Sequence, residues 1–217
     1  LGRPVKFIPD RLESFVTDIH ARENRVKARM AVSSDGEIQA LDIQILAGVG
    51  AYSQYPRTSV FEANQILNIT GGPYRHRHYR AVAEVVYLNK VPTSQYRAVG
   101  HPIGNAVGEA LVDLAAEATG IDPIEFRRLN VMPDDGYPAV TAAGIEVKDL
   151  SHQRCIDGLV AAMDYAALRR EQAALRGQGI QRGIGIATFI KGTAPGPAGY
   201  YGMGGAPIAS QDACPRS

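Results

Sequence analysis

Two stretches near the start of the chain alternate apolar and polar side chains, which is the period of a β-strand with one buried face. They are residues 26–32 and residues 38–46, and the turn-forming run Ser34-Asp35-Gly36 lies between them. A tight turn between two alternating segments is typical of an antiparallel hairpin. The pattern therefore predicts a hairpin that buries one of its faces.

A helical period follows later in the chain. Residues 103–118 carry apolar side chains at intervals of three and four, which places them on one face of a helix. Pro102 fits the first turn of that helix and Gly120 fits its end. The positions expected to face the core are Ile103, Ala106, Val107, Ala110, Leu111, Leu114, Ala115 and Ala118.

Shorter helices are predicted on both sides of the long one. Asp10 can cap a helical turn as far as residue 15, and a short helix is expected in residues 59–66. Residues 122–125 combine an N-cap aspartate, a first-turn proline and a capping-box glutamate. Two more helices are predicted in residues 151–163 and 164–175. The first of these should bury Ile156, Leu159, Val160 and Met163.

Short apolar runs predict three further strands, in residues 4–8, 81–88 and 183–190, all largely buried. Residues 207–211 are another candidate. The glycine-rich segment 193–206 is interpreted as a mobile loop, with a lid over a substrate channel as the alternative. Its glycine spacing does not match a dinucleotide fingerprint.

The predicted elements describe an α+β fold in which antiparallel strands pack on helices. Residues 133–138 are rich in proline, aspartate and glycine, which favours a boundary at this point. We expect residues 1–135 to be part of one domain and residues 136–217 to be the start of a second.

The 217 residues carry a formal net charge of +1 at pH 7. A chain so close to neutral is not expected to present the concentrated basic face that nucleic acids and membrane surfaces require in a partner. No apolar run approaches the roughly 20 residues that cross a bilayer, and no signal peptide is visible. These observations predict a soluble, cytoplasmic protein with no nucleic-acid or membrane partner.

Neither the cysteines nor the histidines fall at the spacing of metal ligands. Cys155 and Cys214 are far apart, so we interpret them as reduced thiols. Without a Cys-x-x-Cys pair, the chain is expected to hold no iron–sulfur cluster of its own. His76 and His78 have no third ligand near them, so they are predicted to be two solvated histidines beside a strand rather than a metal site.

The most informative stretch is residues 91–102, between a predicted strand and the long helix. Such a junction offers free backbone N–H groups and the positive end of the helix dipole. Arg97 adds a permanently charged planar donor, and Gly100 allows a tight turn or the close approach of a ligand. The residues alone predict an anion-binding loop, with a solvated surface arginine as the alternative.

This stretch also carries a family resemblance. Pro92-Thr93, Tyr96-Arg97-Ala98, Gly100 and Pro102 resemble a motif of the molybdopterin-binding large subunit of the xanthine dehydrogenase/aldehyde oxidase family. The branch that contains aerobic carbon monoxide dehydrogenase is the most similar. Further stretches match the same family in order, so that the resemblance covers nearly the whole chain: residues 2–13, 46–52, 109–113, 120–130 and 182–187.

The resemblance implies a molybdenum-dependent oxidoreductase that hydroxylates an N-heterocycle or an aldehyde with oxygen from water. It assigns Arg97 to the cofactor pocket, with Tyr96, Ala98, Val99 and Gly100 as the surrounding wall. The implied cofactor is molybdopterin, and its nucleotide form stays open, the cytosine dinucleotide being one form. FAD and a 2Fe-2S cluster are expected in partner subunits or domains, namely an FAD-binding medium subunit and an iron–sulfur small subunit.

Two departures from the family narrow the small-molecule substrate. Carbon monoxide dehydrogenases carry a copper-binding cysteine where this chain has Ala98, so oxidation of carbon monoxide is not expected. Xanthine dehydrogenases carry a phenylalanine at the position of Val99 and a substrate-orienting arginine where the alignment places Gln65. An amide can still donate and accept hydrogen bonds. Gln65 and Val99 are therefore the predicted substrate contacts, for another N-heterocycle, a methylxanthine or an aldehyde.

The Gly-Gln-Gly segment and the catalytic glutamate of the family have no counterpart in these 217 residues. No catalytic residue is therefore assigned. The chain is expected to be a central fragment of a longer large subunit, without tight cofactor binding or turnover on its own. The alternative is a non-catalytic structural or interaction remnant of the same family.

Overall fold

The computed structural model describes residues 2–54 and 59–191. The elements follow in the order α1 (Arg11–Thr17), β1 (Asn24–Val32), β2 (Ile38–Gly48), α2 (Phe61–Ile69), β3 (His78–Val86), α3 (His101–Thr119), α4 (Pro123–Asn130), β4 (Ala139–Val140), β5 (Glu146–Val147), α5 (His152–Met163) and α6 (Tyr165–Gly177). None of the helices in these ranges has the length and apolar character of a membrane span.

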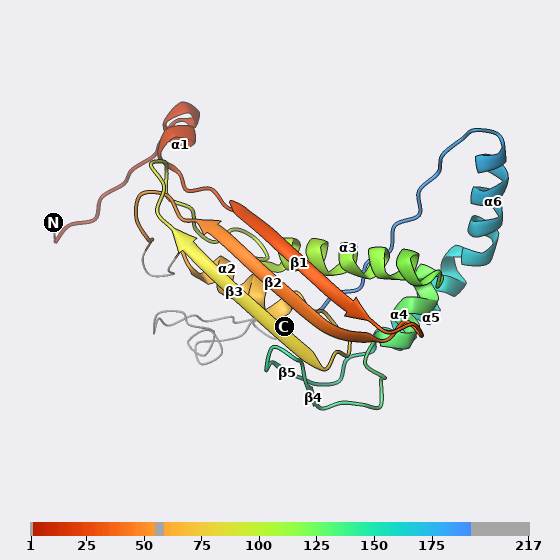
Figure 1. Cartoon of the computed structure of the whole chain (residues 1–217). Coiled ribbons are helices and arrows are strands. Elements are labelled where there is room, and N and C mark those ends of the chain that lie inside the picture. The colour runs from red at the N-terminus through yellow and green to blue at the C-terminus, as the bar shows by residue number, and fades with distance from the viewer. Residues whose placement is uncertain (1, 55–58, 192–217) are drawn as a thin grey trace, which may run out of the picture.

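A three-stranded sheet forms one layer of the molecule (Figure 1). β1 and β2 pair in antiparallel register, with Ala28 opposite Ile43, and the predicted hairpin is confirmed. β3 joins the other edge of β2 in parallel register, with Ala81 opposite Ile43. The sheet is therefore mixed rather than antiparallel throughout, because α2 carries the chain back before β3 begins. The predicted α+β class is confirmed.

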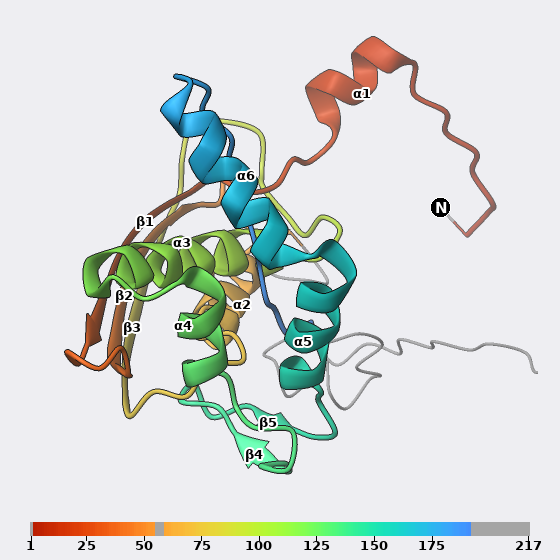
Figure 2. The ribbon, with the colours of Figure 1, turned by 90° about the vertical axis from the view of Figure 1, so that its right-hand side faces the viewer.

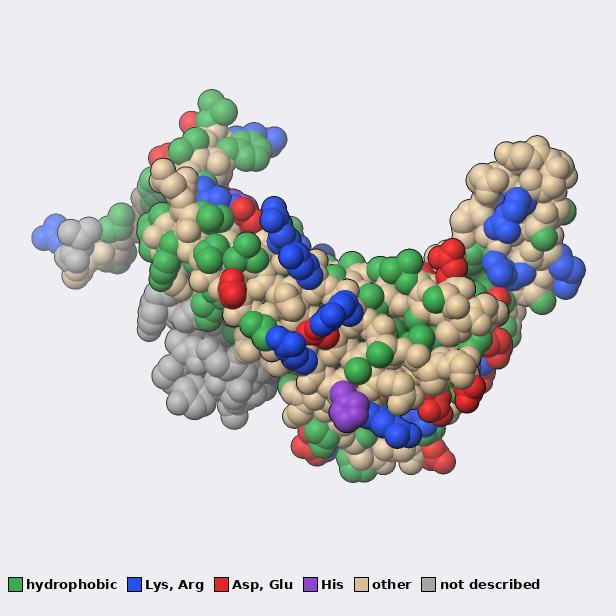
Figure 3. Space-filling model, in the orientation of Figure 1, with side chains coloured by type: hydrophobic (Ala, Val, Ile, Leu, Met, Phe, Trp, Pro, Cys, Tyr) green, Lys and Arg blue, Asp and Glu red, His purple; other side chains and the backbone are tan. Residues whose placement is uncertain are grey.

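Helices α2 and α3 cover one face of this sheet (Figures 1 and 2). Leu41, Ile43 and Ile45 of β2 are at most 3% exposed and belong to one buried cluster with Ile66 of α2. The opposite face stays open and carries several Lys and Arg side chains (Figure 3). The prediction of a largely buried strand in residues 81–88 was wrong, because the outward positions of the edge strand β3 are exposed.

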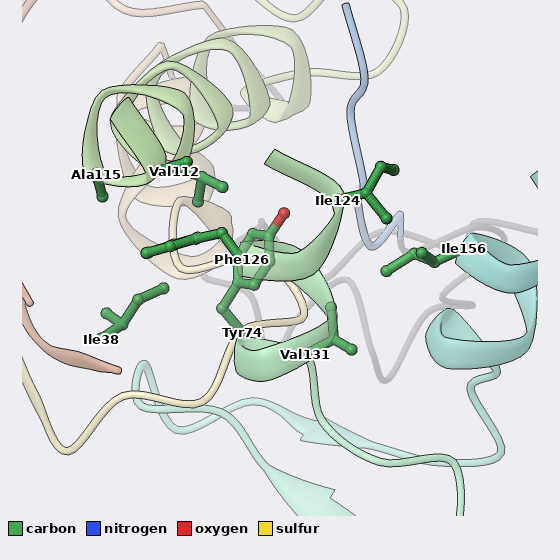
Figure 4. Close-up of a cluster of buried hydrophobic side chains, with 9 residues drawn as sticks. Ile38, Tyr74, Val112, Ala115, Ile124, Phe126, Val131 and Ile156 are labelled. Atoms are coloured by element: carbon green, nitrogen blue, oxygen red, sulfur yellow. The ribbon is translucent and has the colours of Figure 1, made fainter. Parts of the chain in front are cut away.

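A second buried cluster joins α3, α4 and α5 (Figure 4). Phe126 and Ile124 of α4 are fully buried beside Val112 of α3, and Ile156 of α5 packs with them. Ile38, the first residue of β2, reaches the same cluster. The burial of apolar surface therefore connects the sheet to the helices that follow it.

The helix ends follow the signals in the sequence. Asp10 accepts a hydrogen bond from the backbone N–H of Glu13, and Asp122 accepts one from that of Ile124. Gly120 closes α3 in the left-handed conformation, with φ of 70°. Local hydrogen bonding and backbone freedom are enough to explain all three boundaries.

A buried ion pair lies beside the second cluster. The fully buried Arg127 guanidinium donates to Glu109 Oε2 from Nε (3.1 Å) and from Nη2 (2.8 Å). Nη1 donates to the carbonyl oxygen of Pro123 (3.1 Å), and Nη2 also reaches the carbonyl oxygen of Ile186 (2.8 Å) and Oδ1 of the more exposed Asp113 (2.9 Å). The Tyr74 hydroxyl donates to Glu109 Oε1 (2.7 Å), and burial raises the pKa of this phenol. The network connects α3 and α4 with the segment that follows α6.

Two predicted strands are not formed. In residues 4–8, Val5, Phe7 and Ile8 are between 70% and 73% exposed, and this segment extends from the body of the molecule with α1 (Figure 2). Residues 183–190 alternate between half-buried and exposed side chains but join no strand ladder. Both segments are apolar enough for a strand, but a strand also needs a neighbour to satisfy its backbone groups, and none of the described residues provides one.

The buried faces of two helices also differ from the prediction. The buried positions of α3 are His101, Gly104, Gly108, Glu109, Val112, Ala115 and Ala116. Of the predicted stripe, Ala106, Ala110, Leu114 and Ala118 are instead exposed. In α5, Ile156 is buried as predicted, whereas Val160 and Met163 are half-buried and Leu159 is exposed. Gly104 and Gly108 of α3 face the end of α2, where the two helices approach closely.

Replacing the buried arginine tests the importance of the ion pair. Arg127→Ala should lower the free energy of unfolding by about 3–5 kcal/mol, because it leaves the Glu109 carboxylate buried without its cationic partner. The measurement is urea denaturation of the 217-residue chain, followed by circular dichroism.

The adjacent Arg128 provides the matched control, since it pairs with Glu125 and Asp157 in partly exposed ion pairs. Arg128→Ala should cost at most about 1 kcal/mol. The double variant Arg127→Met/Glu109→Leu, which buries no charge, should be more stable than Arg127→Ala. Equal losses in the two single variants would contradict this account.

Candidate binding site at the start of helix α3

The loop between β3 and α3 is anchored to the end of β2. The backbone N–H of Thr93 donates to Val49 O (3.1 Å), and its hydroxyl donates to Gly48 O (3.0 Å). The Ser59 hydroxyl donates to Thr93 O (2.7 Å), and both of these side chains are buried. These bonds fix the position from which the loop continues towards α3.

The chain then turns sharply into α3 over residues 97–100. Ala98 has φ of 60° and Gly100 has φ of 73°, so the backbone enters the left-handed region twice. His101 donates from its backbone N–H to Ala98 O (2.9 Å) and from Nδ1 to Val99 O (3.0 Å), since a carbonyl oxygen can only accept. The turn is therefore held by contacts to its main chain.

Helix α2 packs directly against this turn. A Cβ atom at Gly100 would lie 2.5 Å from Gln65 Cβ and 3.0 Å from Glu62 O, which is closer than a methyl group can approach without displacement. Glycine is required here both for its positive φ and for the lack of space. The structure thus brings Gln65, which is 5% exposed, against the predicted cofactor loop.

The predicted site residues lie together but differ in their exposure. Tyr96 and Arg97 are exposed, Ala98 and Val99 are half-buried, and Gly100 and Gln65 are buried. Arg97 takes part in no ion pair among residues 2–54 and 59–191. Its guanidinium is therefore available to a ligand at the protein surface.

The turn has the donors that an anionic group needs. Within the described part of the chain, the amides of Val99 and Gly100 donate to no backbone acceptor. They directly precede α3, whose N-terminal end carries a partial positive charge. Together with the Arg97 guanidinium, these donors suit an anionic ligand.

Two residues beside the loop were missed by sequence reasoning. Glu62 Oε2 accepts hydrogen bonds from Arg22 N (3.0 Å) and Asn24 Nδ2 (3.2 Å). The Arg22 guanidinium donates to the carbonyl oxygen of Arg97 and lies 5.2 Å from the centre of the Tyr96 ring. Because these segments are far apart in the chain, no local pattern revealed the cluster.

Three atoms of this cluster are buried without a hydrogen-bond partner among the described residues. They are Arg22 Nε, Asn24 Oδ1 and Glu62 Oε1. Most buried polar atoms in proteins are paired, so unpaired ones are expected where a site borders a ligand or ordered water. This observation agrees with a binding site at the adjacent loop.

The two histidines singled out in the sequence differ in their surroundings. His78 is exposed, but His76 is half-buried, so the prediction that both are solvated was wrong for His76. Its Nδ1 donates to Tyr74 O (3.1 Å), and burial lowers the pKa of the imidazole. Across residues 2–54 and 59–191, no three His, Cys, Asp or Glu side chains are grouped so that they could hold a metal ion.

The remaining sequence candidates lie elsewhere. Cys155 is exposed and is a free thiol. The glycine-rich segment 193–206, the strand predicted in residues 207–211 and Cys214 are outside the described residues.

Comparison with known proteins gives a consistent result. Residues 1–131 match the family model of the molybdopterin cofactor-binding domain. The chain is 31% identical over 192 residues to the nicotine 6-hydroxylase large subunit of Paenarthrobacter nicotinovorans, covering 88% of this chain and 23% of that protein. It is 30% identical over 203 residues to the carbon monoxide dehydrogenase large chain of Hydrogenophaga pseudoflava, covering 91% of this chain and 25% of that protein. The chain therefore spans about a quarter of the length of these relatives.

Solved structures show the same similarity. Quinoline 2-oxidoreductase from Pseudomonas putida 86 superimposes with a TM-score of 0.86 and 30% identity, over 94% of this chain and 26% of that one. A Cu,Mo-CO dehydrogenase superimposes with a TM-score of 0.74 over 82% of this chain and 22% of that one. At 23% identity, the second match supports the fold alone.

A glycine comparison tests the close contact between the turn and α2. Gly120 also has a positive φ, of 70°, but nothing lies within 4 Å of a Cβ built there. Gly120→Ala should therefore cost only the backbone strain of about 1–2 kcal/mol. Gly100→Ala should cost about 1–3 kcal/mol more, because its methyl group must displace α2. Urea denaturation of both variants measures the difference, and equal losses would show that the contact is not tight.

Proposed function

The chain belongs to the molybdopterin cofactor-binding domain family, and on this basis we propose that it forms part of the cofactor site of a molybdenum hydroxylase large subunit. The observation that carries this proposal lies at the start of α3. Arg97 is exposed there, beside the amides of Val99 and Gly100, which donate to no backbone acceptor among the described residues. Gln65 on α2 lies against the same turn.

Each loop residue then has a role towards the cofactor. When bound, the molybdenum cofactor supplies a metal centre for the oxidative hydroxylation of carbon with oxygen from water. Arg97 donates to anionic oxygen atoms of the cofactor, and the amides of Val99 and Gly100 donate beside it. Tyr96 and Ala98 form the adjoining wall.

We assign the substrate side of the site to Gln65 and Val99. The Gln65 amide can both donate to and accept from the ring nitrogen or carbonyl groups of a heterocycle. Val99 offers an aliphatic contact rather than an aromatic platform, and the methyl group of Ala98 cannot bind copper. An N-heterocycle agrees with these features, and nicotine and quinoline appear in the names of two similar proteins. An aldehyde is the alternative substrate class.

The proposed reaction also requires partners that receive electrons. We infer an FAD-binding medium subunit and an iron–sulfur small subunit, in the cytoplasm, by analogy with multi-subunit relatives. The proposed cofactor is molybdopterin, with the cytosine dinucleotide as its extended form. Residues 1–135 would belong to the first cofactor-binding domain and residues 136–217 to the start of the second. Among the described residues, Ile156 of the second part packs into the cluster of α3 and α4.

The direct test is the metal content of the large subunit that contains this chain, purified with its partner subunits. The proposal expects stoichiometric molybdenum and a releasable pterin, together with oxidation of an N-heterocycle by a dye acceptor. A large subunit without molybdenum or pterin would overturn the proposal and favour the alternative of a non-catalytic structural remnant.

Arg97→Ala tests the role of the loop within that protein. Molybdenum occupancy or turnover should fall more than about tenfold, because a charge-assisted contact contributes roughly 1.5–3 kcal/mol. Arg77→Ala, which also removes an exposed arginine, is the matched control and should leave both quantities unchanged. Thermal stability is measured in parallel, and an unchanged Arg97→Ala enzyme would remove Arg97 from the site.

A further inference from the structure

Arg22 lies where three separate parts of the chain meet. It is in the segment between α1 and β1, where His20 forms a parallel bridge with Thr93 and accepts a hydrogen bond from the N–H of Ser94 (3.0 Å). Arg22 itself has φ of 67°, in the left-handed region that side chains disfavour. Such a conformation persists where surrounding contacts over-determine it, and it is often found at functional sites.

Both ends of Arg22 are held by specific contacts. Its backbone N–H donates to Glu62 Oε2 (3.0 Å), and the Glu62 side chain is buried in the first turn of α2. Its guanidinium donates to the carbonyl oxygen of Arg97 and lies 5.2 Å from the centre of the Tyr96 ring. The planar group can therefore stack on an aromatic ring and donate in its own plane at the same time.

These contacts determine the geometry of the proposed site. Once the carbonyl of Arg97 is fixed, the peptide planes of Ala98 and Val99 follow from the hydrogen bonds that His101 donates to them. The directions of the Val99 and Gly100 amides are set as a result. Glu62 is on the same helix as Gln65, so Arg22 also connects the proposed substrate side with the cofactor loop.

We propose that Arg22, held by the buried carboxylate of Glu62, is a positioning residue that orients the 96–100 loop towards the cofactor. This inference rests on the proposed function, because the loop binds a cofactor only if that function is correct. Arg22 contacts the main chain of Arg97 and the ring of Tyr96, so it acts through the loop and is not a catalytic residue.

The first measurement follows the loop without any cofactor. Hydrogen exchange of the backbone amides of Ser94 and His101 is compared between the 217-residue chain and its Arg22→Gln variant. Exchange should become about tenfold faster or more, because a charge-assisted hydrogen bond and a stacking contact are lost. Exchange in the middle of α3 should stay the same. Arg25→Gln removes an equal charge from the exposed outer face of β1 and is the matched control.

Arg22→Lys separates positioning from general stability. Lysine keeps the charge and a donor but cannot stack its head group as a plane, so it should restore part of the protection of the loop. A variant in which all segments exchange faster would have a folding defect instead, and would overturn the assignment of a local role. Exchange at wild-type rates in Arg22→Gln would overturn it as well.

The second measurement uses the purified large subunit with its partner subunits. In Arg22→Gln, the half-time for loss of molybdenum during dialysis should shorten about tenfold or more, and Arg22→Lys should be intermediate. If the wild-type protein contains no molybdenum, the proposed function is wrong. The hydrogen-exchange result still decides whether Arg22 holds the loop. A wild-type protein and an Arg22→Gln variant that retain molybdenum equally well leave the function intact and overturn the role of Arg22.

Discussion

The buried ion pair between Arg127 and Glu109 is the constraint on which the arrangement of the helices depends. A guanidinium without solvent is tolerated only if its donors are matched, and here they reach α3, the start of α4 and the carbonyl of Ile186. This requirement fixes the rotation of α3 about its own axis. Because α3 is a single helix of 19 residues, the rotation set at Glu109 also determines where the turn at Gly100 lies.

The second constraint on α3 is the lack of space beside α2. A Cβ atom at Gly104 would lie 2.8 Å from Ile69 Cγ1, and one at Gly108 would lie 2.6 Å from Thr70 O. Together with Gly100, these glycines let the two helices approach along the first half of α3. The same contact holds Gln65 against the loop, so close helix packing and the geometry of the site have one physical origin.

Sequence reasoning succeeded where the cause is local. The hairpin of β1 and β2, the caps at Asp10 and Asp122, and the end of α3 at Gly120 all follow from neighbouring residues. The loop in residues 96–100 was singled out from a contiguous motif, and the structure places it directly before α3. The buried face of α3 was predicted only in part. Ala115 is buried as predicted, but the helix also buries Gly104, Gly108 and Glu109, and it leaves most of the predicted alanines and Leu114 exposed. The buried face of α3 depends on its contacts with Arg127 and with α2. The spacing of apolar residues within α3 contains no information about these contacts.

The parts that could not be predicted are those that depend on a distant partner. The parallel pairing of β3, the missing strands in residues 4–8 and 183–190, and the contact of Arg22 with Arg97 belong to this group.

The loop in residues 96–100 is held almost entirely through its main chain. Arg22 donates to the Arg97 carbonyl, and His101 donates to Ala98 O and Val99 O. The side chains at positions 98 and 99 can therefore change without loss of these bonds. Under the proposed function, these main-chain bonds would orient the loop towards the cofactor whichever side chains stand at positions 98 and 99.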